Sequence, residues 1–366
     1  MLNSADSRVA GELTVKVQVV DDVIVHATSH LERPLRAMSR LLQKQGPDMA
    51  CQMLPLLFAV CGEAHALAGK LASGVLSVRE RAAINTHLAG VLRENLRERL
   101  LQLVQYWDLP LSNQSLASSL KEITFAMERG DVSARQMAAE ALLHELNNRI
   151  RHQHWLPQLT EKLQNKLAGV RLPEEIRSSH DWLAFGPAAD IGTNLVNDNG
   201  GTVYNGNFYS GQGAAALLRS PGCELGEVLA SAVQLQWQSL LTVMDGLIDS
   251  TPGGDWLRLQ QNEQQGRGWV NTARGWLLHE VSSSQGEELP GWNIQAPTDV
   301  NFTGDLVSAC LTGMQVPDGK VDIAVRRLIR VLDPCVGFNV EVLTADEITA
   351  ADRFGSELSA GANRHA

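Results

Sequence analysis

Two cysteines near opposite ends of the chain stand in contexts where a thiol can do chemistry. Cys61 precedes His65 by four positions, a spacing that places both side chains on one face of a helix. An imidazole next to a thiol can hydrogen-bond the sulfur or lower the pKa of the thiol; alternatively, Cys61 is a buried cysteine that packs as a small hydrophobe. Cys335 follows Asp333-Pro334, and because proline fixes its own φ and cannot continue a helix, this pattern predicts a cysteine presented on a turn.

The other three cysteines are predicted to have structural roles. The chain has five cysteines, an odd number, and they are widely scattered, which favours reduced thiols over a disulfide framework. We expect Cys51 and Cys223 to be buried in helices, and Cys310 likewise to be buried. The sequence contains no CxxC and no His/Cys cluster with zinc spacing.

Composition limits the class of protein. The chain has 366 residues, of which 44% are hydrophobic and 20% charged, as in a globular protein with a substantial core. Lys and Arg number 31 against 41 Asp and Glu, so the net charge is −10, and without a basic stripe the chain is a poor partner for nucleic acid or an anionic membrane. No apolar run approaches the roughly 20 residues that span a bilayer, and the polar N-terminus lacks the apolar stretch of a secretory signal. We therefore expect a cytoplasmic protein with no nucleic-acid or membrane partner.

The elements that must position the two cysteines follow from the periodicity of the sequence. Residues 13–27 alternate between apolar and polar types around Asp21-Asp22, which predicts a β-hairpin over residues 11–28. Residues 33–249 form the predicted helical body, with prolines at several helix starts. Its amphipathic segments are 77–107, 112–128, 131–150 and 155–168, followed by one more helix at about 223–249.

The C-terminal part of the pattern is first β-like and then helical. Residues 266–298 are punctuated by glycines and predict a β-rich segment. Two helical pieces follow, so that a C-terminal helix and the turn with Cys335 occupy residues 304–338. Glycines and asparagines mark loops over 186–213, where no phosphate-binding glycine motif occurs. We predict a single α+β, predominantly helical domain over 1–350 and a flexible tail over 351–366.

The two cysteine segments resemble the cofactor-binding ends of the [NiFe]-hydrogenase large subunit. Near its N-terminus that family carries the motif R-I/V-C-G-x-C-x-x-x-H-x-x-A. Cys61, His65 and Ala68 match its second cysteine, its histidine and its alanine. Phe58 stands where the first cysteine of the motif should be.

The C-terminal motif of the family, D-P-C-x-x-C-x-x-H, and two further segments agree with this resemblance. Residues 333–335 match D-P-C, but Phe338 and Glu341 replace the last cysteine and the histidine. Residues 8–13 resemble the family's R-I/V-E-G-H-L, with Ala10 in place of the glutamate. The family's pattern G-x-G-x-x-E-A-P-R-G-x-L-x-H…P-T-x-W-N is matched in part, at Arg274, His279, Pro297, Thr298 and Asn301. The resemblance implies a shortened fold like that of the large subunit.

The substitutions limit the metal chemistry that the resemblance implies. In the family, four thiolates hold nickel and iron, whereas here one cysteine survives from each pair, and phenylalanine cannot ligate a metal. The resemblance therefore implies that Cys61 and Cys335 hold one metal fragment, iron as Fe(CN)2(CO), and that no nickel is bound. One iron held by both sulfurs requires them to lie about 3.3 to 4.5 Å apart, an estimate by analogy with metal–thiolate bond lengths.

The resemblance also implies which groups surround this fragment. Arg274 and Thr298 would donate to cyanide nitrogens, Pro297 would border the diatomic ligands, and His65 belongs to the same cofactor-binding set. An ordinary surface or salt-bridged arginine is the alternative for Arg274. For His279 a structural role is favoured over a role as a ligand, and no chemistry is assigned to the aspartate of D-P-C.

Hydrogen turnover is not expected of this chain, because the resemblance assigns proton movement to a glutamate that is replaced by Ala10. Since Glu341 replaces the family's histidine, we also expect no C-terminal processing. Retained cofactor residues with lost catalysis look like the HupK/HoxV-type accessory proteins of hydrogenase maturation. That resemblance implies a non-catalytic scaffold that receives Fe(CN)2(CO) from a HypC–HypD-type assembly complex and passes it to the hydrogenase large subunit precursor. The alternatives are a metal-free interaction protein or chaperone that mimics the large subunit, and a residual metalloenzyme.

Overall fold

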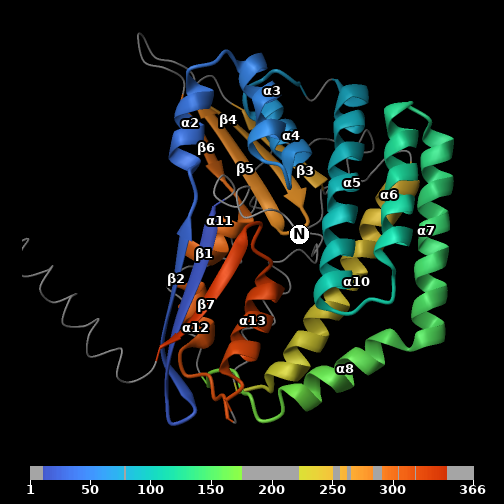
Figure 1. The fold of residues 1–366 in the computed structure, drawn as a ribbon. Coiled ribbons are helices and arrows are strands. Elements are labelled where there is room, and N and C mark those ends of the chain that lie inside the picture. Colours follow the sequence, from blue (N-terminus) through green and yellow to red (C-terminus); the bar gives the residue numbers. More distant parts are fainter. Residues whose placement is uncertain are drawn as a thin grey trace, which may run out of the picture.

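Two small β-sheets lie beside a larger helical part of the molecule (Figure 1). The predicted α+β, predominantly helical class is confirmed. The predicted loops over 186–213, the tail over 351–366 and Ala10 lie outside the residues that the structure describes. The computed structural model describes residues 11–77, 80–174, 222–249, 256–261, 265–282, 291–303, 305–317 and 319–343.

The N-terminal hairpin is confirmed, with strands β1 (Glu12–Val20) and β2 (Val23–Glu32) paired in antiparallel fashion. Asp21 and Asp22 both have a positive φ, 48° and 60°, as in the two-residue type I′ turn that matches the twist of a hairpin. β2 continues past the predicted end of the hairpin at residue 28. One face of β1 is buried because every second residue is apolar, namely Leu13, Val15 and Val17.

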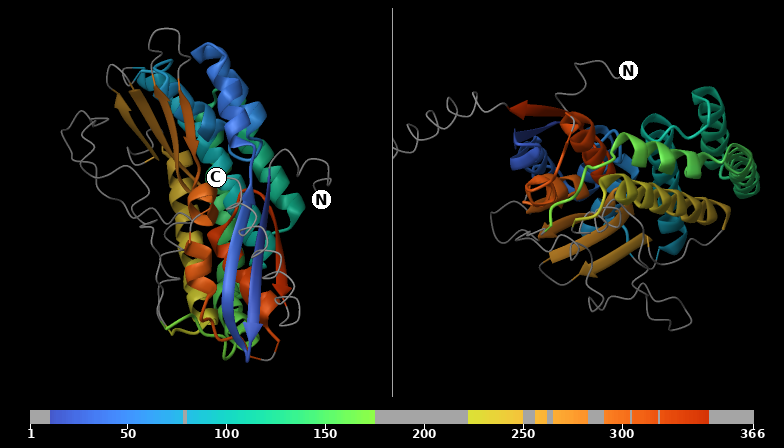
Figure 2. Two further views of the ribbon diagram at one scale, coloured as in Figure 1. Left: turned by 90° about the vertical axis from the view of Figure 1, so that its left-hand side faces the viewer. Right: turned by 90° about the horizontal axis from the view of Figure 1, so that it is seen from below.

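A C-terminal strand that the sequence analysis missed completes this sheet. β7 (Gly337–Leu343) pairs with β1 in parallel, so that the sheet order is β2-β1-β7 (Figure 2). The alternation of Phe338, Val340 and Val342 was the available signal, but only Val340 is buried on this edge strand. Since Gly337 lies opposite Glu12, the pairing places the turn with Cys335 beside the start of β1.

The predicted β-rich segment is a second, antiparallel sheet with the order β3-β4-β5-β6. The segment is confirmed in type, but its bounds differ from 266–298. It begins earlier, with β3, and ends earlier, because Pro297 opens the short helix α11 (Pro297–Thr303). The strands are β3 (Leu257–Gln261), β4 (Gln265–Thr272), β5 (Gly275–Ser282) and β6 (Trp292–Gln295).

The predicted helices are present, with shifts of a few residues in their bounds. None of the helices in the described ranges has both the length and the apolar character that crossing a membrane requires. Helix α10 packs on α5, α7 and α8, and α6 packs on α7. The helices are α2 (Leu35–Gln43), α3 (Pro47–Leu57), α4 (Gly62–Ala72), α5 (Arg81–Tyr106), α6 (Asn113–Glu128), α7 (Val132–Gln153), α8 (Trp155–Lys166), α10 (Leu225–Ile248), α12 (Leu306–Leu311) and α13 (Val321–Leu332).

Helix α4 carries His65 and packs on the face of β4 and β5. Most of its residues are buried, and many of them are alanine or glycine, which let neighbouring backbones come close. Two glycines of β4 permit this close approach: a Cβ atom at Gly266 would lie 2.0 Å from the carbonyl oxygen of Ala72, and one at Gly268 would lie 2.2 Å from the carbonyl oxygen of Ala68. These contacts set the depth of α4 on the sheet and thereby the position of Cys61, which directly precedes the helix.

We expect Gly268→Ala to lower the free energy of unfolding by about 1–3 kcal/mol, because the added methyl group overlaps the carbonyl oxygen of Ala68 and must displace α4. Gly337→Ala is the matched control, since nothing lies within 4 Å of a Cβ at that strand position. Urea denaturation of both variants measures the effect. An unchanged denaturation midpoint for Gly268→Ala would contradict this account of the packing.

Candidate functional site

Cys61 lies at the end of the loop between α3 and α4 and is not part of a helix. Its carbonyl oxygen accepts a hydrogen bond from the His65 backbone N–H at 3.0 Å, so that Cys61 caps the first turn of α4. As the capping residue, Cys61 has non-helical backbone angles (φ −135°, ψ 37°), so the helical spacing of four positions does not apply to its side chain. In the part of the chain that the structure describes, no hydrogen bond joins the His65 ring to the thiol, and the alternative of a histidine-activated thiol is therefore wrong.

Cys335 lies on a turn, as the sequence predicted. Asp333 has a left-handed backbone (φ 49°) that ends α13, and the chain then passes through Pro334 into β7. The backbone N–H of Cys335 donates to the hydroxyl oxygen of Thr298 at 3.0 Å, and Thr298 is itself buried near the start of α11. We call residues 333–335 the DPC turn. Helix α11 holds this turn by a second contact, since the side-chain amide of Asn301 donates to the carbonyl oxygen of Leu332 at 3.4 Å.

The structure brings the thiols of Cys61 and Cys335 into electrostatic contact. Burial raises the pKa of the Cys61 thiol, and the neighbouring Cys335 raises it further. Arg274 and Arg33 act against this shift, so both guanidiniums lie within reach of the sulfur. Both cysteines are half-buried. Within the described ranges, no group of three or more histidine, cysteine, aspartate or glutamate side chains is arranged to hold a metal ion.

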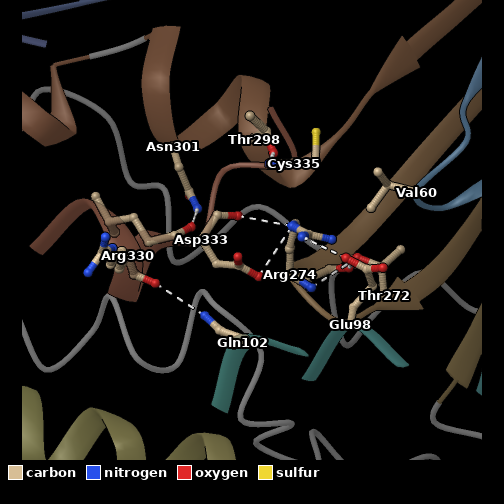
Figure 3. A network of polar contacts seen from close by, with 12 residues as sticks. Val60, Glu98, Gln102, Thr272, Arg274, Thr298, Asn301, Arg330, Asp333 and Cys335 are labelled. Atoms are coloured by element: carbon tan, nitrogen blue, oxygen red, sulfur yellow. Dashed lines mark hydrogen bonds and ion pairs between the residues drawn. The ribbon is translucent and has the colours of Figure 1, made fainter. Parts of the chain in front are cut away.

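Arg274 lies between the DPC turn and helix α5 (Figure 3). Its Nε donates to the backbone oxygen of Asp333 at 3.1 Å and lies 3.2 Å from the Asp333 carboxylate, while Nη2 donates to Glu98 at 3.1 Å. The tight turn between β4 and β5 presents this side chain, because the hydroxyl of Thr272 bonds across the turn to the Gly275 oxygen and accepts from the Arg274 N–H. Burial alone would lower the pKa of Arg274, but Asp333, Glu98 and the two cysteines outweigh it and raise the pKa, so the guanidinium stays charged.

Arg33 is a second arginine at this site, and the sequence analysis missed it. Its side chain is only 7% exposed, and its Nη1 donates to both carboxylate oxygens of Asp299, at 2.9 and 3.0 Å. Cys335, Asp299 and Cys61 together raise its pKa against the lowering effect of burial. Asp299, which directly follows Pro297-Thr298, was a possible signal in the sequence. Only the fold shows that its carboxylate pairs with Arg33, the residue after β2.

His65 and His279 form a buried chain with Trp292. The indole N–H of Trp292 can only donate, and it donates to Nδ1 of His279 at 3.1 Å. Nε2 of His279 must then carry the proton and donates to Nδ1 of His65, 2.8 Å away. By the same logic Nε2 of His65 carries a hydrogen, and this buried atom has no partner in the described part of the chain. The structural role predicted for His279 fits these contacts.

The two replaced cysteine positions are filled by packing. Phe58 is buried and stacks on the His65 ring, with centroids 3.6 Å apart and an interplanar angle of 4°. Phe338 lies in β7 opposite Leu13. Glu341, in place of the family's histidine, forms an ion pair with Lys16 at 2.9 Å. These positions therefore contribute to the fold.

The remaining cysteines divide into two kinds. Cys51 in α3 and Cys310 in α12 are buried, as predicted. The prediction for Cys223 is wrong, because this residue precedes α10 and is exposed. The predicted helix starts two residues too early: α10 begins at Leu225, and the Cys223 backbone instead accepts a hydrogen bond from Leu172 N–H at 2.9 Å, with its thiol exposed.

Glu94 is a further residue that sequence reasoning missed. Its carboxylate accepts the backbone N–H groups of Glu63 and Ala64, at 2.8 and 3.1 Å, and so caps the N-terminus of α4 directly after Cys61. Burial raises the pKa of Glu94 to about 7 in spite of these two hydrogen bonds. Glu94 also lines a cavity of about 300 Å³ together with Gly62. Side-chain capping by a distant helix has no local signal in the sequence.

The buried histidines predict a loss of stability in acid. Burial lowers the pKa of His65 well below its usual value, and burial lowers that of His279 to about 3. The unfolded chain binds protons at both imidazoles near pH 6.5, whereas the folded protein does not, so the free energy of unfolding falls as the pH decreases from about 6.5 by up to about 1.4 kcal/mol per pH unit for each histidine.

We therefore expect His279→Gln, measured by denaturant unfolding between pH 7.5 and about 4.5, to show a shallower pH dependence than the wild type. His26→Gln, on the exposed side of β2, is the control and should keep the wild-type slope. The same slope in all three proteins would mean that His279 is not kept neutral by the fold.

Comparison with known proteins gives similarities over most of the chain. No protein-family model matches it. Among solved structures, a chain of the [NiFeSe]-hydrogenase from Dm. baculatum is similar with a TM-score of 0.49 and 15% identity, over 90% of this chain and 97% of that one.

Curated relatives are more informative. The chain is 30% identical over 361 residues to the hydrogenase expression/formation protein HupK of Azotobacter vinelandii, covering 92% of this chain and 100% of the relative. It is 30% identical over 372 residues to the protein HupV of Azotobacter chroococcum, again covering 92% and 100%. It is 25% identical over 356 residues to HoxV of Cupriavidus necator, covering 85% of this chain and 91% of that protein. The chain therefore belongs to the family of hydrogenase expression/formation proteins that includes HupK, HupV and HoxV.

Proposed function

We propose that this protein is a non-catalytic scaffold that holds an Fe(CN)2(CO) fragment between Cys61 and Cys335 during hydrogenase maturation. Its membership of a family of hydrogenase expression/formation proteins supports a role in making a hydrogenase. The observation that carries the proposal is that two thiols from opposite ends of the chain lie close enough to act on each other electrostatically, beside the Thr298 hydroxyl that holds the Cys335 backbone.

The ligand set supports a fragment that brings ligands of its own. With Phe58 and Phe338 at the two other motif positions, the site offers two thiolates, which are soft ligands suited to low-spin iron. Two protein ligands leave most of the iron coordination sphere to be filled, and cyanide and carbon monoxide fill it in this proposal. A bimetallic site with nickel would need the two missing cysteines, so no nickel is part of the proposal.

Several hydrogen-bond donors suit the cyanide nitrogens of such a fragment. The Thr298 oxygen accepts from the Cys335 N–H, which leaves the hydroxyl hydrogen of Thr298 available to donate. In Arg274, Nε and Nη2 are engaged by Asp333 and Glu98, and Nη1 has no hydrogen bond to any described residue. Nε2–H of His65 is a buried donor without a partner in the described ranges. Pro297, which is buried directly before Thr298, would border the diatomic ligands in this proposal.

The proposed cargo is held in a way that permits its release. Two thiols must lose their protons when iron binds, and the raised pKa of Cys61 means that protons compete with the metal for this sulfur. Two thiolates also bind one metal less strongly than a site with four. Transfer to the complete cysteine set of an apo large subunit is therefore downhill. In this proposal a HypC–HypD-type complex in the cytoplasm supplies the fragment and the hydrogenase large subunit precursor receives it.

A second function, from a different class, has an observation in its favour. A metal-free chaperone that binds a hydrogenase subunit or a maturation factor needs an exposed apolar surface. Leu56 of α3 is 83% exposed and Phe125 of α6 is 54% exposed. Under this alternative, Cys61 and Cys335 are ordinary core residues, and their replacement leaves the function intact.

Infrared spectroscopy of protein purified anaerobically from a hydrogenase-expressing host tests the proposal. We expect cyanide and carbonyl stretching bands in the wild type and their loss, together with the loss of bound iron, in Cys61→Ala and Cys335→Ala. Cys223→Ala is the matched control, because this thiol is exposed and lies just before α10, and it should keep the bands. Wild-type protein without any such bands would count against the scaffold.

Complementation separates the scaffold from the metal-free alternative. In a host that lacks this protein, we expect the double variant Cys61→Ala/Cys335→Ala to leave hydrogenase activity near that of the deletion strain, because no fragment can be held. Cys223→Ala should restore activity to the wild-type level. Full activity with the double variant would instead support the metal-free interaction protein.

A further inference from the structure

Arg33 is held in a fixed position beside the thiol pair. It follows β2 directly, and its guanidinium is anchored by two hydrogen bonds from Nη1 to Asp299, at 2.9 and 3.0 Å. Gly11 closes over its side chain, since a Cβ at that glycine would lie 2.8 Å from Cγ of Arg33, and Gly11 has the positive φ of 99° that favours glycine. Nearly the whole side chain is therefore enclosed, at 7% exposure.

The positive charge of Arg33 acts on both candidate metal ligands, Cys61 and Cys335. Cys335 and Cys61 interact electrostatically with it, and so does the ring of His65. Its partner Asp299 is the residue after Thr298, whose hydroxyl holds the backbone of Cys335. Arg33 and Asp299 thus form one side of the site, and Arg274 with its carboxylates forms another.

The guanidinium of Arg33 binds Asp299 through only one of its three nitrogens. Nη1 makes both hydrogen bonds to Asp299, and neither Nη2 nor Nε bonds to any residue that the structure describes. Arg274, by comparison, uses two of its three nitrogens to bind Asp333 and Glu98. A guanidinium presents its donors in a planar fork, so one edge can hold a carboxylate while another reaches an anionic ligand.

A buried positive charge next to two thiols changes which metal the site accepts. A bare divalent cation is repelled by the guanidinium, and this repulsion is strong because the surroundings are poorly solvated. An iron whose charge is already balanced by two cyanides is a neutral fragment and is not repelled. Its cyanide ligands are anionic, and their nitrogens accept hydrogen bonds. The N–H groups of Arg33 that do not bind Asp299 can donate to them.

We propose that Arg33 makes the thiol pair selective, by excluding bare divalent metal ions and by donating hydrogen bonds to an anionic ligand on the iron. This inference rests on the proposed function for the identity of the iron ligands. The exclusion of bare cations can be tested without the iron fragment. The selectivity proposed for Arg33 and the proposed scaffold function can therefore be overturned independently.

Anaerobic titration of the full-length, metal-free protein with Zn²⁺, against a chromophoric chelator, tests the exclusion. We expect Arg33→Met to bind Zn²⁺ on the order of tenfold more tightly than the wild type, from the loss of one buried positive charge. Arg33→Lys keeps the charge and should bind like the wild type. Arg36→Met, an exposed position on α2, is the matched control and should also bind like the wild type.

The double variant Arg33→Met/Asp299→Asn excludes a simpler explanation, in which an unpaired Asp299 becomes a zinc ligand. It should still bind Zn²⁺ more tightly than the wild type. Wild-type affinity in this double variant, with a folded circular dichroism spectrum, overturns the exclusion.

The donor role is tested in protein loaded in the hydrogenase-expressing host. In Arg33→Lys, which keeps the ion pair with Asp299 but not the fork, we expect a shift of one cyanide band with the iron content retained. A merely structural arginine would lower the occupancy of the site without moving any band. Cyanide bands at the wild-type positions in folded, iron-loaded Arg33→Lys would overturn the role of Arg33 as a hydrogen-bond donor to the cyanide. Absence of all bands from the wild type would instead overturn the proposed function.

Discussion

The buried ion pair between Arg274 and Asp333 is the interaction on which the arrangement of this site depends. It joins the β4–β5 turn to the turn that carries Cys335, and through Glu98 it also joins both to α5. Asp333 has a left-handed backbone that residues other than glycine seldom adopt, and the same guanidinium binds both its carbonyl oxygen and its carboxylate. Since removing one partner of a buried pair typically costs about 3–5 kcal/mol, charge pairing as well as packing determines where the C-terminal thiol lies.

The same pairing sets the electrostatics of the region between the thiols. Arg33 is paired with Asp299, and Arg274 with Asp333 and Glu98, so both guanidiniums are held in place and their charge is partly balanced, although both still act on the Cys61 thiol. For the proposed cargo, the carboxylates of Asp299, Asp333 and Glu98 partly offset the attraction between the two guanidiniums and the thiolates. Such a site holds its ligand with limited affinity, which suits a protein that must give the ligand up.

Phe58 and the aromatic and imidazole groups around it form a packed cluster beside the first turn of α4. The buried ring of Phe58 stacks on the imidazole of His65. His65 is tied in turn to His279 and Trp292, so the imidazole orientation is set by hydrogen bonds and needs no metal. The fold around α4 is thereby stabilised independently of any cargo, because its buried polar groups are mostly satisfied within the chain.

The sequence by itself determined the local features of this protein. The hairpin with its two-aspartate turn, the amphipathic helices and the cysteine after Asp333-Pro334 follow from residues that are neighbours in the chain. The resemblance to the [NiFe]-hydrogenase large subunit then named Cys61, Cys335, Arg274 and Thr298 as candidates. Only the tertiary structure shows the partners: the parallel pairing of β7 with β1, the ion pair of Arg33 with Asp299, the capping of α4 by Glu94, and the hydrogen bond between His65 and His279. The physical reason is that periodicity and turn chemistry act over a few residues, whereas a buried charge or imidazole takes whichever distant group the packing places within hydrogen-bond distance.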